Sequence, residues 1–176
     1  AGVKIDAFAY LPVQEFGNAF STFIAQNYGA RQEDRIRKGL KGAVLAAAAF
    51  SVVISALVWG FARPLMALFV EGTETAIIAE GARYLRIEGA FYCGIGCLFL
   101  LYGLYRALGR PGMSVVLTVI SLGTRVALAY ALSSVPLFRV TGIWWSVPIG
   151  WALADITGFL YYLLRKRQLL SWGKTP

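Results

Sequence analysis

The sequence predicts an all-α fold, a polytopic membrane bundle of five transmembrane helices. Its residues are 58% hydrophobic and only 15% charged, with a mean hydropathy of +0.63, whereas soluble domains are roughly 45–50% apolar. Several apolar runs reach the length of about 20 residues that a membrane-spanning helix needs. Basic residues gather in the connections between these runs, so membrane topology explains the net charge of +8 better than nucleic-acid binding does.

Each expected span has its own sequence signal. A basic loop, residues 31–41, follows the first span, and the second span is free of charge and stops before Arg63. Thr73 is a candidate N-cap for an interfacial helix of about residues 73–86. The helical pattern then continues without a break to Leu108. The spans are expected at about residues 5–28, 43–62, 87–108, 113–135 and 143–164.

The distribution of basic residues predicts the orientation in the cell (inner or plasma) membrane. If the spans alternate, eleven Lys and Arg residues lie on one side and five on the other, and the richer side faces the cytoplasm. The C-terminus is then cytoplasmic and the N-terminus external. Because the chain starts without Met, we expect it to be a fragment of a longer protein. The cytoplasmic set is Arg31, Arg35, Arg37, Lys38, Lys41, Arg106, Arg110, Arg165, Lys166, Arg167 and Lys174.

A polar stripe runs along the first span. At 100° per residue, Asn18, Thr22 and Gln26 fall within about 60° of Glu15. Such a stripe cannot face lipid, so it must face other helices or a water-filled cleft. Glu15 has no basic residue at matching depth, and it could bind a proton, a cation or a cationic ligand. The alternative is a partly hydrated carboxylate whose partner lies on a helix outside this chain.

Two further charges, Arg125 and Asp155, lie well inside expected spans. Their depths differ by only about 6 Å on adjacent antiparallel helices. A structural ion pair between them is therefore feasible, and we assign Arg125 a structural role. Asp155 also joins Glu15, Asn18, Thr22 and Gln26 as a candidate for an ion-binding or substrate-binding cleft.

The third span has an acidic start and a row of small residues. Glu88 begins its membrane part and is expected at the interface. Gly89, Cys93 and Cys97 recur every four positions, which would allow a close helix approach, and the cysteines are interpreted as packing residues.

The residue types argue against an enzyme. The chain has no histidine, so neither a Ser-His-Asp nor a Cys-His arrangement can form. No phosphate-binding Gly-rich loop and no metal-ligand spacing is present, and no cofactor is expected. Coupling to Na⁺ or H⁺ would have to use carboxylates.

An ordered set of motifs runs along the chain: Lys4-Ile-Asp-Ala-Phe-Ala-Tyr-Leu-Pro12 with Phe20-Ser-Thr-Phe-Ile-Ala-Gln-Asn-Tyr-Gly-Ala30, Arg83-Tyr-Leu-Arg-Ile87, Arg106-Ala-Leu-Gly-Arg-Pro111 and Gly142-Ile-Trp-Trp-Ser-Val-Pro148. In this order they resemble the eighth helix and its following loop, the start of the tenth helix, the turn after it and the start of the twelfth helix of the multidrug and toxic compound extrusion (MATE) transporters. Arg125 also lies where the eleventh helix of that family usually carries an arginine.

This resemblance implies the last five helices of a twelve-helix, two-lobe transporter. Such a protein would export organic cations or other amphipathic compounds by alternating access, in exchange for Na⁺ or H⁺. Its partners would be the lipid bilayer, small cationic substrates and a missing N-terminal lobe, with no nucleic acid. Two positions depart from the family pattern: Ile95 stands near an acid that some members carry, and Val126 replaces the usual proline.

Two other functions remain open on the sequence. A lipid-linked glycan flippase of the same superfamily would share the fold and prefer basic residues in its cleft, as Arg125 would provide. A non-transporting membrane scaffold would use the intramembrane charges only to lock the bundle.

Overall fold

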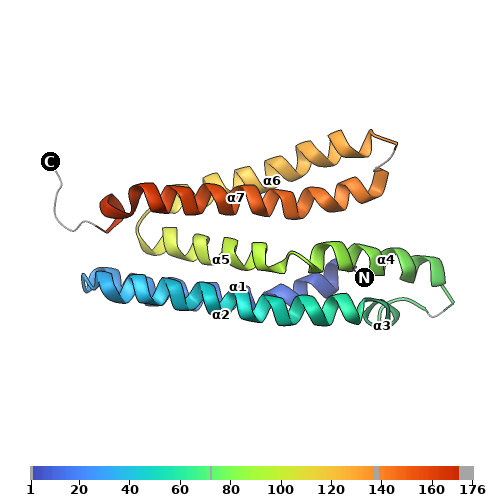
Figure 1. The fold of residues 1–176 in the computed structure, drawn as a ribbon, viewed down its shortest axis with the longest axis horizontal. Helices are drawn as coiled ribbons and strands as arrows, with labels where there is room; N and C mark the ends of the chain where they lie inside the picture. The colour runs from blue at the N-terminus through green and yellow to red at the C-terminus, as the bar shows by residue number, and fades with distance from the viewer. Residues whose placement is uncertain (1, 72, 137–138, 171–176) are drawn as a thin grey trace.

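The computed structural model describes residues 2–71, 73–136 and 139–170, which form helices and contain no strand. The expected all-α membrane bundle is thereby confirmed. The helices are α1 (Gly2–Gly29), α2 (Glu33–Gly60), α3 (Ala62–Ala67), α4 (Thr75–Gly89), α5 (Tyr92–Ala107), α6 (Pro111–Ser133) and α7 (Arg139–Leu169), and Figure 1 shows their arrangement.

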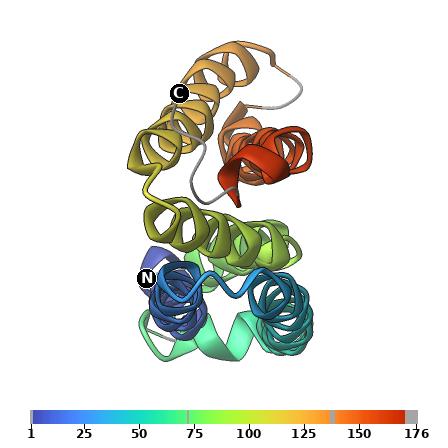
Figure 2. The same ribbon diagram turned by 90° about the vertical axis from the view of Figure 1, so that its left-hand side faces the viewer.

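Helix α5 lies at the centre of the bundle. The α1–α2 pair packs on one side of it and the α6–α7 pair on the other, as Figure 2 shows. Leu98, Leu101 and Leu104 of α5 are almost completely buried between these layers. Helix α6 packs mainly on α7 and touches α5 over a smaller surface.

Glycines set the closest helix contacts. A Cβ at Gly103 of α5 would lie 2.6 Å from the carbonyl oxygen of Gly17 on α1, so any larger residue would push these helices apart. A Cβ at Gly150 of α7 would likewise lie 2.6 Å from the Ser121 carbonyl oxygen of α6. Cys93 and Cys97, which the sequence suggested as packing residues, are half-buried free thiols.

The described helices include several candidate membrane spans. Helices α2, α6 and α7 are each long and apolar enough to cross a membrane, and α4 with α5 forms one further candidate, bent by 50°. Their exposed Leu, Val and Ile side chains fit a lipid-facing surface. Helix α1 is not among these candidates, so the count of five spans stays a prediction.

Two expectations about helix limits were wrong near the membrane surface. Residues 33–41 are not a loop but the first turns of α2, where Arg37 pairs with Glu33 one turn earlier. Thr73 is not an N-cap, because α4 begins at Thr75 after Glu74, which makes no capping hydrogen bond through its side chain.

The expected unbroken helix to Leu108 was also wrong. The chain bends by 50° between α4 and α5. At the bend, the Phe91 amide donates to the Glu88 carbonyl (3.0 Å) and the Gly94 amide donates to the Phe91 carbonyl (2.8 Å), which are turn contacts rather than helical ones. The helical pattern of apolar residues continues across this bend, so the sequence pattern did not reveal it.

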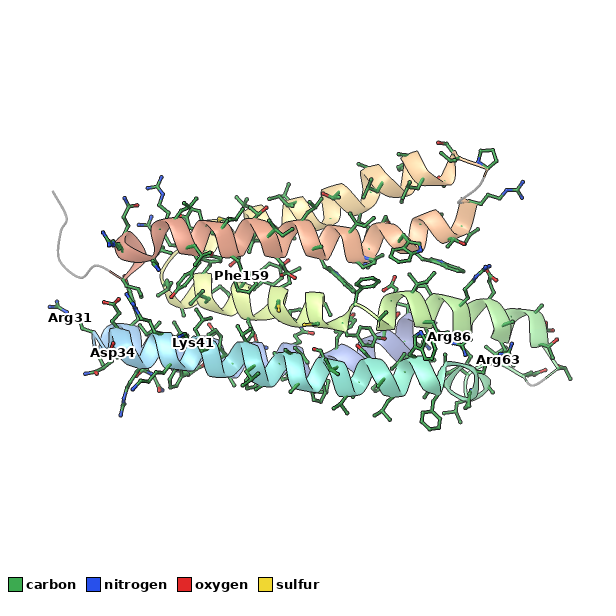
Figure 3. All side chains as sticks on the ribbon, viewed as in Figure 1. Arg31, Asp34, Lys41, Arg63, Arg86 and Phe159 are labelled. Atoms are coloured by element: carbon green, nitrogen blue, oxygen red, sulfur yellow. The ribbon has the colours of Figure 1, made fainter. Side chains whose placement is uncertain are left out.

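The connections alternate between the two ends of the bundle. Figure 1 places the α1–α2 turn, the α5–α6 turn and the end of α7 at one end of the bundle, and the end of α2, the end of α6 and the start of α7 at the opposite end. Arg31 and Lys41 lie at the first end and Arg63 and Arg86 at the other (Figure 3). This agrees with the alternating spans expected from the sequence, while the cytoplasmic orientation stays a prediction.

Candidate functional site

A cavity of about 900 Å³ lies where α1, α4 and α5 face the α6–α7 pair. Its size is that of a small-molecule site. The polar side chains that line it include Asp6 and Gln14 of α1, Tyr84 and Glu88 of α4, and Arg125 of α6. Much of the remaining wall is aromatic, formed by Tyr10, Phe99, Tyr102, Tyr130, Trp144 and Trp151.

Asp6 is the most deeply buried carboxyl in this wall, with 3% of its surface exposed. The Tyr92 hydroxyl donates a hydrogen bond to its Oδ1 atom. Its Oδ2 atom is also buried and has no hydrogen-bond partner within the described parts of the chain. A buried carboxyl oxygen without a donor is costly, so this atom is a candidate ligand for a proton or a cation.

Glu88 lies beside it on the last turn of α4 and is 5% exposed. Tyr84, one turn earlier, interacts electrostatically with both Asp6 and Glu88, and Arg125 of α6 interacts with Glu88. We call these residues, together with Tyr92, the acidic cluster. The acidic cluster contains two carboxyls and one guanidinium, so one further positive charge would balance it when both carboxyls are ionised.

The expected ion pair between Arg125 and Asp155 is not formed. Among the described residues, only Glu33 and Arg37 form an ion pair within 4 Å. Arg125 instead lines the same cavity as Glu88 and lies within electrostatic range of it. Asp155 faces α5, where its Oδ2 atom would lie 3.7 Å from a Cβ at Gly94. The two residues match in depth, but their helices turn the side chains toward different neighbours.

The predicted stripe of α1 lies outside the acidic cluster. Glu15, Asn18, Thr22 and Gln26 are all exposed. The Asn18 side-chain amide donates to Glu15 Oε2 (3.4 Å) and accepts from Arg106 (3.0 Å). The structure thus brings Glu15, Asn18 and Arg106 into one chain of contacts.

Part of this stripe forms a separate polar groove of about 460 Å³, which we call the amide groove. Asn18, Thr22 and Gln26 line it together with Arg106. A smaller space lined by Gln14 and Asn18 lies between the amide groove and the cavity of the acidic cluster. Polar side chains therefore continue along α1 from one end of the bundle toward the other.

Sequence reasoning missed Asp6 and assigned Glu88 to the interface. A signal for Asp6 was present, because steps of four from Gln26 lead through Thr22, Asn18, Gln14 and Tyr10 to Asp6. No comparable signal identified Glu88, since its burial depends on the bend after α4 and on the packing of α4 against α1 and α7. The roles of Glu15 and Asp155 stay predictions.

Comparison with known proteins identifies the family. The family model described as MatE matches residues 1–131, and the chain belongs to this family. The probable multidrug resistance protein YoeA of Bacillus subtilis (strain 168) is 25% identical over 94% of this chain and 36% of its own length. The probable multidrug resistance protein YpnP of the same strain is 30% identical over 90% of this chain and 35% of its own. The chain thus spans about a third of these relatives.

Solved structures show the same fold. An inward-facing and an outward-facing multidrug resistance MATE family transporter of the MOP superfamily superpose with TM-scores of 0.87 and 0.88, each at 21% identity over 96% of this chain. They are covered over 39% and 38% of their own chains. The bent form of the Vibrio cholerae MATE transporter VcmN gives a TM-score of 0.85 at 20% identity, over 97% of this chain and 39% of its own.

Proposed function

We propose that this chain supplies the last five membrane helices of a cation-coupled antiporter that exports small organic cations. One observation carries the proposal: in a chain of the MatE family, the buried Asp6 carboxyl lies beside Glu88 at a cavity with aromatic walls. A buried carboxyl inside a membrane protein is costly, and such groups commonly mark ion or proton pathways.

The acidic cluster would couple the ion to the cargo. With Asp6 and Glu88 ionised, its formal charge is −1 after counting Arg125, and a Na⁺ ion or a proton would neutralise it. Binding of that cation in one orientation of the transporter would favour that orientation over the other. Alternating access would then arise from the rocking of this group of helices against a second lobe.

The cavity walls fit a flat cationic cargo. Tyr10, Tyr102 and Trp151 present aromatic rings, which attract organic cations through their faces. The names of YoeA and YpnP, as probable multidrug resistance proteins, agree with such a cargo.

The acidic cluster also argues against anionic cargo. One relative, from Shewanella oneidensis, is named an FAD transporter and is 25% identical over 94% of this chain. FAD carries phosphates, and a lipid-linked glycan carries them too. Two carboxyls against one guanidinium at this cavity favour a cation over either of these ligands.

The amide groove would provide a second part of the transport path. Glu15 and the amides of Asn18 and Gln26 are exposed in this chain, and the second lobe of the complete protein would cover them. The whole assembly would be a multi-pass protein of the cell membrane with a cytoplasmic C-terminus.

Efflux in whole cells tests this proposal. Cells lacking their own efflux pumps would express the complete gene product and be loaded with a fluorescent organic cation. Faster efflux than in vector controls, lost when the Na⁺ or proton gradient is collapsed with an ionophore, is the expected result. Efflux that ignores both gradients would contradict antiport, and unchanged accumulation would favour the scaffold.

A further inference from the structure

A second hollow, of about 620 Å³, lies at the end of the bundle that contains α3 and the start of α4. Three arginines line it, Arg63, Arg83 and Arg86, against the single carboxylate of Glu80. Figure 3 shows Arg63 and Arg86 at this end. We call it the arginine hollow. Its excess of positive charge would attract an anionic ligand.

One arginine is held in place by the protein. The Arg86 Nε atom donates to the Trp59 carbonyl oxygen (3.4 Å), and its guanidinium carbon lies 5.4 Å from the centre of the Trp59 ring. None of the three arginines forms an ion pair within 4 Å with a residue that the structure describes. Arg63 and Arg83 are exposed, so their guanidinium groups are available to a ligand.

The other walls of the arginine hollow are aromatic. Trp59 is 55% exposed, and Phe91 packs edge-to-face against Trp145 with 5.5 Å between ring centres. Tryptophans at helix ends are typical of the membrane–water interface. Val52 and Ala56 precede Trp59 on the same face of α2 and are exposed, so an apolar surface continues from the hollow toward the middle of that helix.

This combination has the chemistry of a lipid site. Guanidinium groups bind phosphate through paired hydrogen bonds, and the aromatic and aliphatic surface beside them suits an acyl chain. We infer that the arginine hollow binds the phosphate of an anionic phospholipid such as phosphatidylglycerol. Zwitterionic lipids carry an ammonium group next to the phosphate, which three arginines would repel. The inference does not depend on the transport activity proposed above.

Lipid retention measured by native mass spectrometry tests the inference. The complete protein would be placed in nanodiscs containing equal amounts of phosphatidylglycerol and phosphatidylcholine, then released and weighed with its bound lipids. Arg63→Gln combined with Arg83→Gln should weaken retention of one phosphatidylglycerol by roughly tenfold, since each arginine near a membrane surface adds to the attraction. Both changes leave Arg86 and its contact with Trp59 intact, and circular dichroism would confirm the helical content.

The matched control is Lys4→Gln, compared with Arg83→Gln alone. Both changes remove one exposed positive charge, but Lys4 does not line the arginine hollow. Lys4→Gln should leave retention unchanged. An equal loss in both variants, or equal retention of phosphatidylcholine, would overturn the inference. Displacement of the lipid by millimolar inorganic phosphate would overturn the assignment of the ligand as a lipid.

Discussion

The Tyr92 hydroxyl donates a hydrogen bond to the Asp6 carboxyl, across 86 positions of sequence. Tyr92 is the first residue of α5 and follows the 50° bend after α4. The bend therefore does more than interrupt a span, because it brings a donor to one oxygen of a buried acid and leaves the other oxygen without one.

Tyr92→Phe should destabilise the protein by about 1–3 kcal/mol, because both oxygens of the buried Asp6 carboxyl would then lack a hydroxyl donor from α5. Thermal unfolding of the complete protein in detergent measures this effect. Tyr130→Phe is the control, since the Tyr130 ring is 78% exposed. Equal stability of the two variants would contradict the importance of this hydrogen bond.

Arg125→Gln should strengthen cation binding at the acidic cluster. Without the guanidinium, Asp6 and Glu88 have no opposing positive charge, so the apparent affinity for the coupling cation should rise on the order of tenfold. Maximal transport should fall, because the bound cation leaves more slowly. The dependence of transport rate on cation concentration shows both effects, and Arg125→Lys should restore them. A purely structural Arg125 would lower stability and leave the apparent affinity unchanged.

Gly103→Ala should separate α1 from α5. The new methyl group would lie 2.6 Å from the Gly17 carbonyl oxygen, and overpacking of this kind costs about 1–3 kcal/mol. Gly123→Ala is the matched control, because nothing lies within 4 Å of the Cβ it would add. The melting temperature should fall for the first variant and stay level or rise for the second. A level melting temperature for Gly103→Ala would show that the helices are free to move apart.

Glu15→Gln should change cargo handling and preserve coupling. Glu15 lies beside Asn18 on the exposed stripe and does not line the cavity of the acidic cluster. Efflux of a cationic cargo should slow a few-fold at low cargo concentration, while its dependence on the ion gradient stays intact. Loss of gradient dependence would instead assign coupling to Glu15. A neutral cargo serves as the control, because its efflux should be unaffected.

The all-α fold was predictable from the sequence, because hydropathy and helical periodicity can be recognised without knowledge of the tertiary structure. The predicted start of α2 was wrong for a physical reason. The charged residues 33–41 extend the helix beyond its apolar part, and an ion pair forms there between Glu33 and Arg37. Hydropathy identifies the apolar part of a helix but does not detect a polar extension of the same helix.

The site was predicted less well because it depends on which way each helix faces. Depth along the span suggested a pair between Arg125 and Asp155, yet Arg125 lines the cavity that contains Glu88, and Asp155 lies against Gly94 of α5. The polar character of α1 was visible from the sequence. Its most buried acid, Asp6, was not selected, because only packing against Tyr92 shows that it is buried.

In the proposed mechanism, the coupling cation binds at Asp6 and Glu88. The most direct test is cargo uptake into proteoliposomes containing the complete protein, driven by an imposed Na⁺ or proton gradient. Asp6→Asn still accepts the Tyr92 hydrogen bond through its amide oxygen, so the protein should fold and bind cargo with an affinity within a few-fold of the wild type. Gradient-driven uptake should be lost in this variant. Uptake by Asp6→Asn at the wild-type rate would contradict binding of the coupling cation at the Asp6 carboxyl.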